Sequence, residues 1–154
     1  MTLHLADAAA TDAFGRQLAA ACEGQGLVVY LHGDLGAGKT SLARALLRHL
    51  GAGERIKSPT YSLVEPYMLV DGRPAWHLDL YRIADPGELE WLGLDALSDP
   101  QSLVLVEWPE RGAGALPPSD LNLSLQHEGT SRSMRMEAAS DRGRQVLGSL
   151  SVCK

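Results

Sequence analysis

The residues from position 33 to position 40 combine glycines, a lysine and a threonine at a spacing that suits phosphate chemistry. They fit Gly-x4-Gly-Lys-Thr, a tight loop whose backbone N–H groups can surround a phosphate chain because no side chains block the approach. The Lys39 ammonium would reach the β- and γ-phosphates, and the Thr40 hydroxyl would bind Mg²⁺. We therefore expect a nucleotide-binding set that consists of Gly33, Asp34, Leu35, Gly36, Ala37, Gly38, Lys39, Thr40 and Ser41.

The segments on either side of this loop are those that the motif requires. Residues 27–31 form a short apolar run that predicts a buried strand, and residues 41–50 carry apolar side chains at helical spacing before Gly51. The positive end of the helix would face the phosphates. The chain holds only three lysines and otherwise uses arginine, which favours a specific role for Lys39 over surface decoration. A glycine-rich turn that fits the pattern by chance is the disfavoured alternative.

Other polar residues could complete a nucleotide site. Glu107 ends the apolar run 102–106 and could hold Mg²⁺, although a solvated charge after a strand is the alternative. In 74–80, alternation would place Asp79 on one strand face with His77 and Tyr81, where it could hold Mg²⁺ or orient water. The alternative is the solvent-facing side of an edge strand.

Two further patterns concern the γ-phosphate and the base. Ser58-Pro59-Thr60 has the character of a switch loop that could offer a hydroxyl to the γ-phosphate, and an ordinary proline turn is the alternative. The Asn-Lys-x-Asp pattern that reads guanine in Ras-type GTPases is missing, since Asn122, the single asparagine, is followed by Leu-Ser-Leu. This leaves ATP as the expected nucleotide.

The composition fits one domain over residues 1–154. The chain is 45% hydrophobic and has a net charge of −5 without a Lys/Arg-rich run, which argues against free-standing nucleic-acid binding. Cys22 and Cys153 have neither zinc-site nor disulfide-framework spacing. No apolar run approaches 18 residues and no signal-peptide pattern is present, so we expect a cytoplasmic protein.

The remaining elements do not alternate strictly between strand and helix. Asp71-Gly72 lies between two strand-like runs and predicts a hairpin, which makes the expected sheet partly antiparallel. The other expected elements are a helix over 11–22, strands over 61–70, 74–80, 102–106, 121–125 and 134–136 with a turn over 127–131, a helix opened by Asp85, Pro86 and Glu88, and a last helix near 146–150.

Five blocks in order along the chain carry a resemblance to a known family. They are the loop at 33–40, Ser58-Pro59-Thr60-Tyr61, Val64-Glu65-Pro66-Tyr67, His77-Leu78-Asp79-Leu80-Tyr81-Arg82 and Leu105-Val106-Glu107-Trp108-Pro109. From about residue 11 to 132 the chain closely resembles the bacterial TsaE (YjeE) family of small P-loop ATPases. These ordered blocks together outweigh the local alternatives given above.

The resemblance implies an α/β, P-loop NTPase-like three-layer fold with a central mixed, partly antiparallel sheet. It implies Mg²⁺-dependent ATP hydrolysis in support of the TsaB–TsaD pair, which makes threonylcarbamoyladenosine at A37 of tRNAs reading ANN codons. The tRNA would be met only through that complex, and no membrane is implied. The implied roles are phosphate contact for Lys39, Mg²⁺ binding for Thr40 and Glu107, water or metal positioning for Asp79, γ-phosphate sensing for Thr60, and nucleotide contacts for Trp108, Arg132 and Thr11.

Two other functions stay open at this point. A kinase would use the same loop to move phosphate to an acceptor, although no arginine-rich lid is evident. A nucleotide-gated binding module would hydrolyse ATP only incidentally. Labelled phosphate on a metabolite would favour the first, and a biological role that survives loss of turnover would favour the second.

Overall fold

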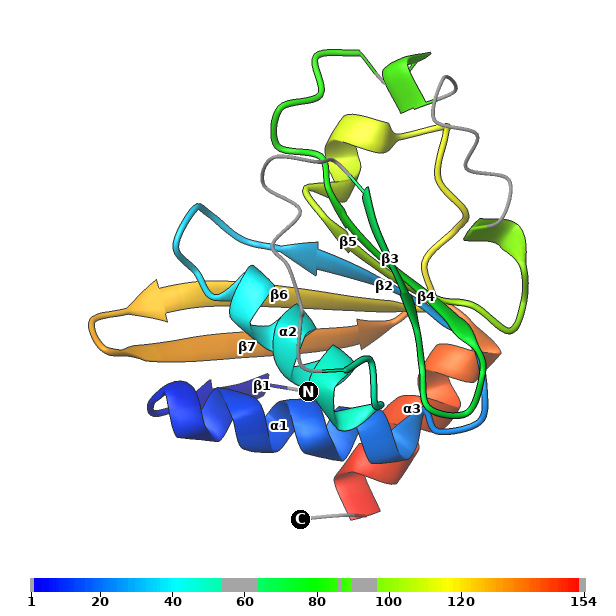
Figure 1. The fold of residues 1–154 in the computed structure, drawn as a ribbon. Coiled ribbons are helices and arrows are strands. Elements are labelled where there is room, and N and C mark those ends of the chain that lie inside the picture. The colour runs from blue at the N-terminus through cyan, green and yellow to red at the C-terminus, as the bar shows by residue number, and fades with distance from the viewer. Residues whose placement is uncertain (1, 54–63, 86, 90–96, 153–154) are drawn as a thin grey trace.

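A seven-stranded mixed sheet organises the chain (Figure 1). The computed structural model describes residues 2–53, 64–85, 87–89 and 97–152, and the side chains of residues 151 and 152 are outside the description. The strand order is β1-β7-β6-β2-β5-β4-β3. The strands are β1 (Thr2–Leu5), β2 (Leu27–His32), β3 (Val64–Met68), β4 (Pro74–Asp79), β5 (Leu103–Glu107), β6 (Leu121–Glu128) and β7 (Ser131–Ala138), and the helices are α1 (Ala8–Ala21), α2 (Lys39–His49) and α3 (Asp141–Val152).

The centre of the sheet is parallel and its two sides are antiparallel. Strands β6, β2, β5 and β4 are parallel neighbours, whereas β3 pairs with β4, β7 with β6, and β1 with β7 in the antiparallel sense. In this register Glu107 is the partner of Leu31 on β2 and of Asp79 on β4. The carboxyl ends of three adjacent strands therefore bring Glu107 and Asp79 beside the loop that follows β2.

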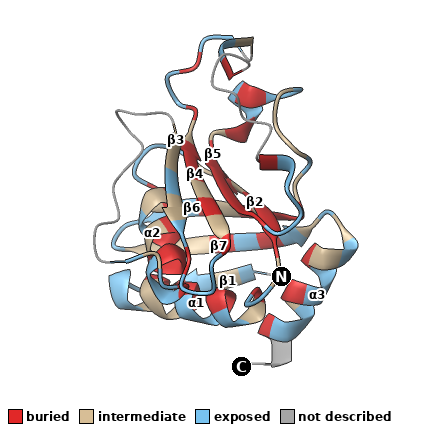
Figure 2. Cartoon of the chain, turned by 45° about the vertical axis from the view of Figure 1, so that its right-hand side comes forward, coloured by how far each residue is buried: buried red, intermediate tan, exposed pale blue. Residues whose placement is uncertain are grey.

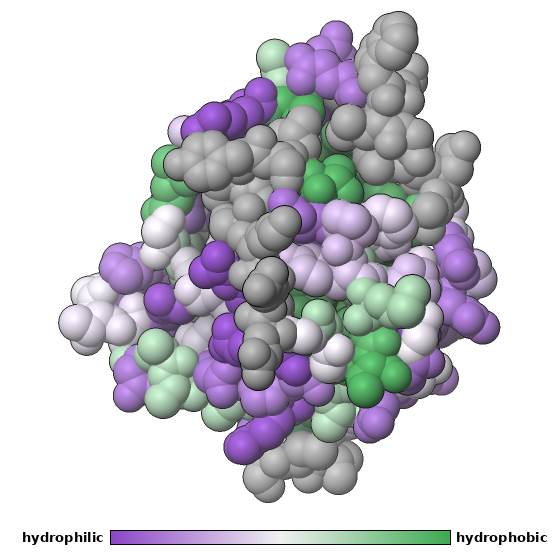
Figure 3. Space-filling model, viewed as in Figure 1, coloured by the Kyte–Doolittle hydropathy of each residue, from purple (hydrophilic) through white to green (hydrophobic). Residues whose placement is uncertain are grey.

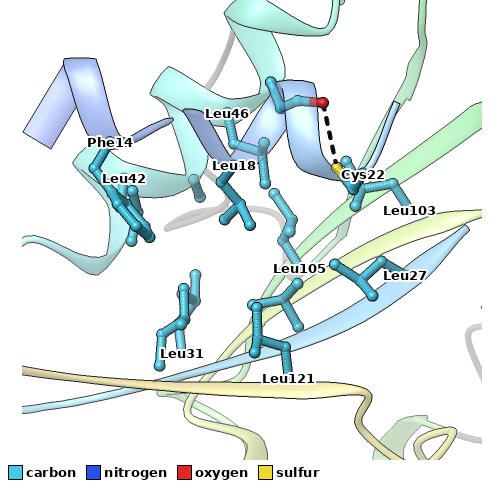
Figure 4. Close-up of a cluster of buried hydrophobic side chains, with 14 of the residues drawn as sticks. Phe14, Leu18, Cys22, Leu27, Leu31, Leu42, Leu46, Leu103, Leu105 and Leu121 are labelled. Atoms are coloured by element: carbon cyan, nitrogen blue, oxygen red, sulfur yellow. Dashed lines mark hydrogen bonds between the residues drawn. The ribbon is translucent and has the colours of Figure 1, made fainter. Parts of the chain in front are cut away.

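The three α-helices in the described part of the chain pack on one face of this sheet. Leu18 of α1, Leu46 of α2 and Val146 of α3 belong to one apolar cluster with the inward side chains of β2, β5, β6 and β7. Figure 4 shows part of this cluster, including Leu18 and Leu46. Helix α1 begins where the Asp7 side chain accepts a hydrogen bond from the Ala10 N–H at 2.9 Å. Gly15 allows α1 to approach α2 closely, because an added Cβ would lie 2.6 Å from the Cβ of Ala45. Helices α1 and α2 therefore pack closely around Ala45, in the second half of α2.

The other face of β2, β4 and β5 carries a second apolar cluster. Leu78, Val104 and Val106 are fully buried beneath side chains from the segments that follow β4 and β5, including Leu80, Leu89 and Leu97. Figure 2 shows β2 and β5 buried along most of their length. Two adjacent parallel strands covered on both faces explain why both read as continuous apolar runs in the sequence.

The fold confirms the mixed, partly antiparallel sheet and refines its elements. Helix α1 starts three residues before the predicted 11, because Asp7 caps it. The turn predicted over 127–131 is present but shorter, since β6 runs to Glu128 and β7 begins at Ser131. Strand β1 had no sequence prediction. The edge-strand alternative for 74–80 is also wrong, because β4 lies between β5 and β3.

The helix expected after Asp85 is described only in part. Residues 87–89 form a short 3₁₀ turn, and Pro86 and residues 90–96 lie outside the described residues.

Among the helices that the structure describes, none is long and apolar enough to cross a bilayer. In the view of Figure 3, the surface over α1 and α2 is mostly hydrophilic, with small apolar patches between the hydrophilic residues.

Candidate nucleotide site

The glycine loop leaves β2 at Gly33 and enters α2 at Lys39. Gly36 and Gly38 have φ values of +80° and +102°, a region that favours glycine. Gly38 also lets the Arg132 guanidinium come close, since an added Cβ would lie 2.3 Å from Nη1 and the arginine would have to shift. The second motif glycine therefore serves both the turn and the close approach of an arginine from β7.

Lys39 is buried although it carries a charge. Its side chain donates to the Gly33 carbonyl, and Nζ lies 3.7 Å from the ring centroid of Trp108. Burial lowers the pKa of Lys39, and the nearby carboxylates of Glu107 and Asp79 oppose that shift only in part. The ammonium thus has a carbonyl and an aromatic face as partners, and both are weaker partners than a phosphate oxygen.

Thr40, Glu107 and His77 form a connected chain of polar side chains. Thr40 Oγ1 lies 2.8 and 2.9 Å from the two carboxylate oxygens of Glu107. The Nε2 atom of His77 lies 2.7 Å from Oε2 of Glu107, and both of these side chains are almost completely buried. The predicted Mg²⁺ ligands Thr40 and Glu107 are therefore in direct contact.

Asp79 stands beside this chain at the end of β4. It is half-buried, and Oδ1 accepts a hydrogen bond from the Tyr81 N–H at 3.1 Å. Burial raises the pKa of Asp79, and the nearby Glu107 charge adds to the rise. A carboxylate with a raised pKa binds a proton more readily near neutral pH than an ordinary aspartate does, which suits proton transfer.

Trp108 forms an aromatic wall with Tyr81. Its backbone has φ 58° and ψ 50°, and it is the one non-glycine residue with positive φ among those described. Its ring centroid lies 5.1 Å from that of Tyr81, and the Arg111 guanidinium lies 5.9 Å from its ring. This left-handed geometry turns the side chain that follows Glu107 back over Lys39.

These groups surround one cavity of about 330 Å³. Most of the predicted site residues line it, namely Leu35, Gly36, Ala37, Gly38, Lys39, Thr40, Ser41, Asp79, Glu107, Trp108 and Arg132. Gly33 and Asp34 instead line a neighbouring hollow against β6 and β7. Thr11 is buried beside the site, where it accepts a hydrogen bond of 3.3 Å from Arg132 Nη1. Thr60 lies outside the described residues.

Three residues at the site were not among the predicted set. Tyr81 and Arg82 line the cavity, and Arg111 lies beside the aromatic wall. Tyr81 and Arg82 continue the His77-to-Arg82 block, so their proximity to Asp79 in sequence was an available signal. Arg111 had no such signal, because it reaches the site only through the 3₁₀ helix Pro109–Gly112.

The oxygen donors at the site fit a magnesium ion that is held partly by waters and substrate phosphates. They do not form a metal site made of protein ligands alone. Within the described ranges, no group of three or more His, Cys, Asp or Glu side chains is arranged to hold a metal ion. Mg²⁺ keeps several waters and usually takes one or two carboxylates together with substrate phosphates. The Thr40 hydroxyl and the Glu107 carboxylate fit this pattern, with Asp79 close enough in register to contribute.

Comparison with known proteins identifies the family. Residues 5–136 match the family described as "Threonylcarbamoyl adenosine biosynthesis protein TsaE". The chain is similar to tRNA threonylcarbamoyladenosine biosynthesis proteins TsaE from Haemophilus influenzae, with 41% identity over 81% of this chain and 78% of the relative. For the Synechocystis protein of that name, the identity is 44% over 72% of this chain and 71% of the relative.

A solved structure agrees with the sequence comparison. The crystal structure of Bacillus subtilis YdiB superposes with a TM-score of 0.78 and 28% identity, and the match covers 99% of this chain and 95% of that one. The mixed sheet and the glycine loop described above are thus those of a P-loop NTPase-like fold. The chain belongs to the TsaE family of tRNA threonylcarbamoyladenosine biosynthesis proteins.

Proposed function

We propose that this protein is a Mg²⁺-dependent ATP hydrolase that supports threonylcarbamoyladenosine modification of tRNA. The observation that carries the proposal is the convergence of Lys39, Thr40, Asp79 and Glu107 on one cavity at the carboxyl ends of parallel strands. Open α/β sheets bind their ligands in the crevice outside such strand ends. Each of these four residues offers a group that phosphoryl chemistry needs.

In this proposal, some site residues bind the nucleotide and Mg²⁺, and Asp79 transfers a proton. The backbone of the glycine loop and the Lys39 ammonium bind the phosphates, while Thr40 and Glu107 hold Mg²⁺. When bound, Mg²⁺ supplies positive charge that offsets the charge of the phosphate oxygens. Asp79 orients the attacking water and accepts its proton, for which the upward shift of the Asp79 pKa is favourable. Trp108 and Arg132 also line the cavity and contact the nucleotide.

The family membership supplies the biological setting. TsaE relatives carry the name of tRNA threonylcarbamoyladenosine biosynthesis proteins. We infer that this protein acts with partners of the TsaB and TsaD families and meets tRNA only through that complex. A net charge of −5 fits a protein that does not hold RNA by itself. The ATP cycle would support the modifying complex, which itself makes the transfer to A37.

Nucleotide binding is the first test. The affinity of the purified protein for ATP, ADP and GTP is measured by isothermal titration calorimetry with Mg²⁺ and with EDTA. We expect adenine nucleotides to bind more tightly with Mg²⁺ and GTP to bind more weakly. A protein with no magnesium-dependent affinity for adenine nucleotides would contradict the proposal.

The partnership needs a separate test. The protein is mixed with TsaB and TsaD from the same organism, and we measure complex formation, phosphate release and modified tRNA over several rounds. ATP turnover should rise in the complete mixture, and the complex should depend on the nucleotide. Absence of both association and any effect on repeated tRNA modification would contradict the role. Appearance of the phosphate on a metabolite rather than in solution would indicate a kinase.

A further inference from the structure

His77 is a polar side chain in an apolar part of the molecule. It is completely buried, and alternation along β4 places it on the same face as Ala75, which belongs to the apolar cluster beneath the helices. Nε2 contacts Glu107, while the buried Nδ1 atom has no hydrogen-bond partner within the described part of the chain. Burying an imidazole with half of its hydrogen-bonding capacity unused costs stability, so packing alone does not explain His77.

The hydrogen bond at Nε2 orients the Glu107 carboxylate. A carboxylate oxygen only accepts hydrogen bonds, so in the 2.7 Å contact His77 Nε2 donates to Oε2 of Glu107. With Oε2 held on this side, both carboxylate oxygens stay within 2.9 Å of Thr40 Oγ1. Glu107 is thereby fixed between a buried donor behind it and the hydroxyl at the cavity in front of it.

We propose that His77 is a positioning residue that fixes Glu107 in the orientation needed to bind Mg²⁺ together with Thr40. This inference rests on the proposed function, because it assigns His77 a role at that same site. His77 does not line the cavity itself, so it acts through Glu107. Outer partners that orient metal ligands in this way typically account for about 10–100-fold in metal affinity.

Two variants separate the hydrogen bond at Nε2 from the mere presence of a polar side chain. In His77→Gln, the amide nitrogen reaches about as far as Nε2 and can still donate to Glu107. In His77→Asn, the amide nitrogen lies near the position of Nδ1 and falls short of Glu107. Both variants place a neutral amide in the same buried site, so they carry similar costs of desolvation.

The readout is the gain in nucleotide affinity that Mg²⁺ provides. The affinity for ADP is measured by titration calorimetry with Mg²⁺ and with EDTA, and thermal unfolding identifies temperatures at which each variant is folded. We expect His77→Asn to lose about tenfold of the magnesium-dependent gain, whereas His77→Gln stays within about threefold of the wild type. Affinity measured in EDTA should be unchanged in both variants, since Glu107 is not needed to hold the phosphates.

His32 offers a matched control. Its Nε2 atom also contacts a side-chain oxygen, Oδ1 of Asn122 at 2.8 Å, but alternation along β2 places it on the opposite face of the sheet. His32→Asn should leave the magnesium-dependent gain unchanged.

Three outcomes would overturn the role of His77. These are an undiminished gain in His77→Asn, equal losses in His77→Asn and His77→Gln, or a loss of affinity that is the same in EDTA as in Mg²⁺. If the wild type itself shows no magnesium-dependent gain, the proposed function fails first, and the two failures are thus distinguishable.

Discussion

The two ends of strand β2 use polar groups in opposite ways. At its first residues, the Val28 N–H donates to Oδ2 of Asp120 at 2.8 Å, and the same oxygen accepts from Arg142 at 2.9 Å. The other oxygen of Asp120 accepts from the Ser140 hydroxyl at 2.6 Å. At the far end of β2, Lys39 donates to the Gly33 carbonyl and contacts the Trp108 ring, and Trp108 has a left-handed backbone conformation.

The glycines show the same contrast. Near Asp120, Gly143 allows backbones to touch, because an added Cβ would lie 1.8 Å from the Asp120 carbonyl oxygen. In the glycine loop after β2, Gly36 has open space around it but a φ of +80°. At the Asp120 end of the sheet, the polar groups are hydrogen-bonded to each other, which stabilises the fold. The other end keeps strained or replaceable contacts, which is typical of a site that exchanges partners with a ligand.

Asp79 should be the residue whose loss affects turnover most. Asp79→Asn keeps the size of the side chain but removes the proton acceptor, so kcat for ATP hydrolysis should fall about 10²–10⁴-fold. Phosphate release under saturating ATP measures kcat, and calorimetry measures nucleotide affinity on the same preparation. Affinity should change little if Asp79 handles the water. An equal loss of affinity and turnover would assign Asp79 to the metal ligands instead.

Asp120 should show the largest effect on stability. Asp120→Ala leaves the buried Val28 N–H without its acceptor and breaks the contacts to Ser140 and Arg142. Urea unfolding should report a loss of roughly 3 kcal/mol, because a buried donor and a partly buried guanidinium lose their partner together.

An exposed aspartate provides the control for Asp120. Asp12 pairs with Arg48 at the surface, where solvent screens the interaction, and Asp12→Ala should cost far less than Asp120→Ala. Nucleotide affinity should remain normal for the folded fraction of both variants. Similar losses of stability in the two variants would remove the contrast between the buried cluster and an ordinary surface pair.

The sequence was more informative about the end of the sheet that carries the candidate nucleotide site than about the end that holds Asp120. Gly33 to Thr40 and Glu107 could be proposed as site residues because a phosphate site requires fixed residue types at fixed spacing, next to apolar strands. The cluster around Asp120 could not, because it joins residues 28, 120, 140 and 142, which are distant in sequence and carry no motif. Strand β1 is four residues long and gave too few positions for a pattern.

Removing the buried charge of Lys39 should lower nucleotide affinity and leave stability unchanged, whereas removing the Asp120 carboxylate should lower stability and leave nucleotide affinity unchanged. Lys39→Met keeps an unbranched side chain of similar length but loses the ammonium, so nucleotide affinity should fall about 10–100-fold. Stability without nucleotide should be maintained, because burial already disfavours the charged form and lowers the Lys39 pKa. Calorimetry and urea unfolding on one preparation measure both quantities. A marked loss of stability would mean that Lys39 belongs with the structural residues.

The smallest expected effect is the change in stability on removing the Asp79 charge. Its sign should be opposite to that of the same substitution at Asp120. Because the pKa of Asp79 is raised above its ordinary 3.8 in the folded protein, the folded chain keeps a proton that the unfolded chain loses. Stability therefore falls as pH rises from 3.8 through the raised value, and the penalty stays constant at higher pH. Asp79→Asn escapes this penalty and should be more stable than the wild type near pH 7. The difference should be below about 1 kcal/mol because solvent screens a half-buried group.

Urea unfolding at several pH values follows this gain, which should shrink as pH falls towards 3.8. Asp120→Asn should destabilise the fold at pH 7, because its carboxylate accepts buried hydrogen bonds that an amide reproduces only in part. Opposite signs for the same substitution in the two carboxylates would show directly that the end of the sheet with the proposed nucleotide site carries a cost in stability. A loss of stability in Asp79→Asn across the whole pH range would instead place Asp79 with Asp120, as a carboxylate that the fold requires.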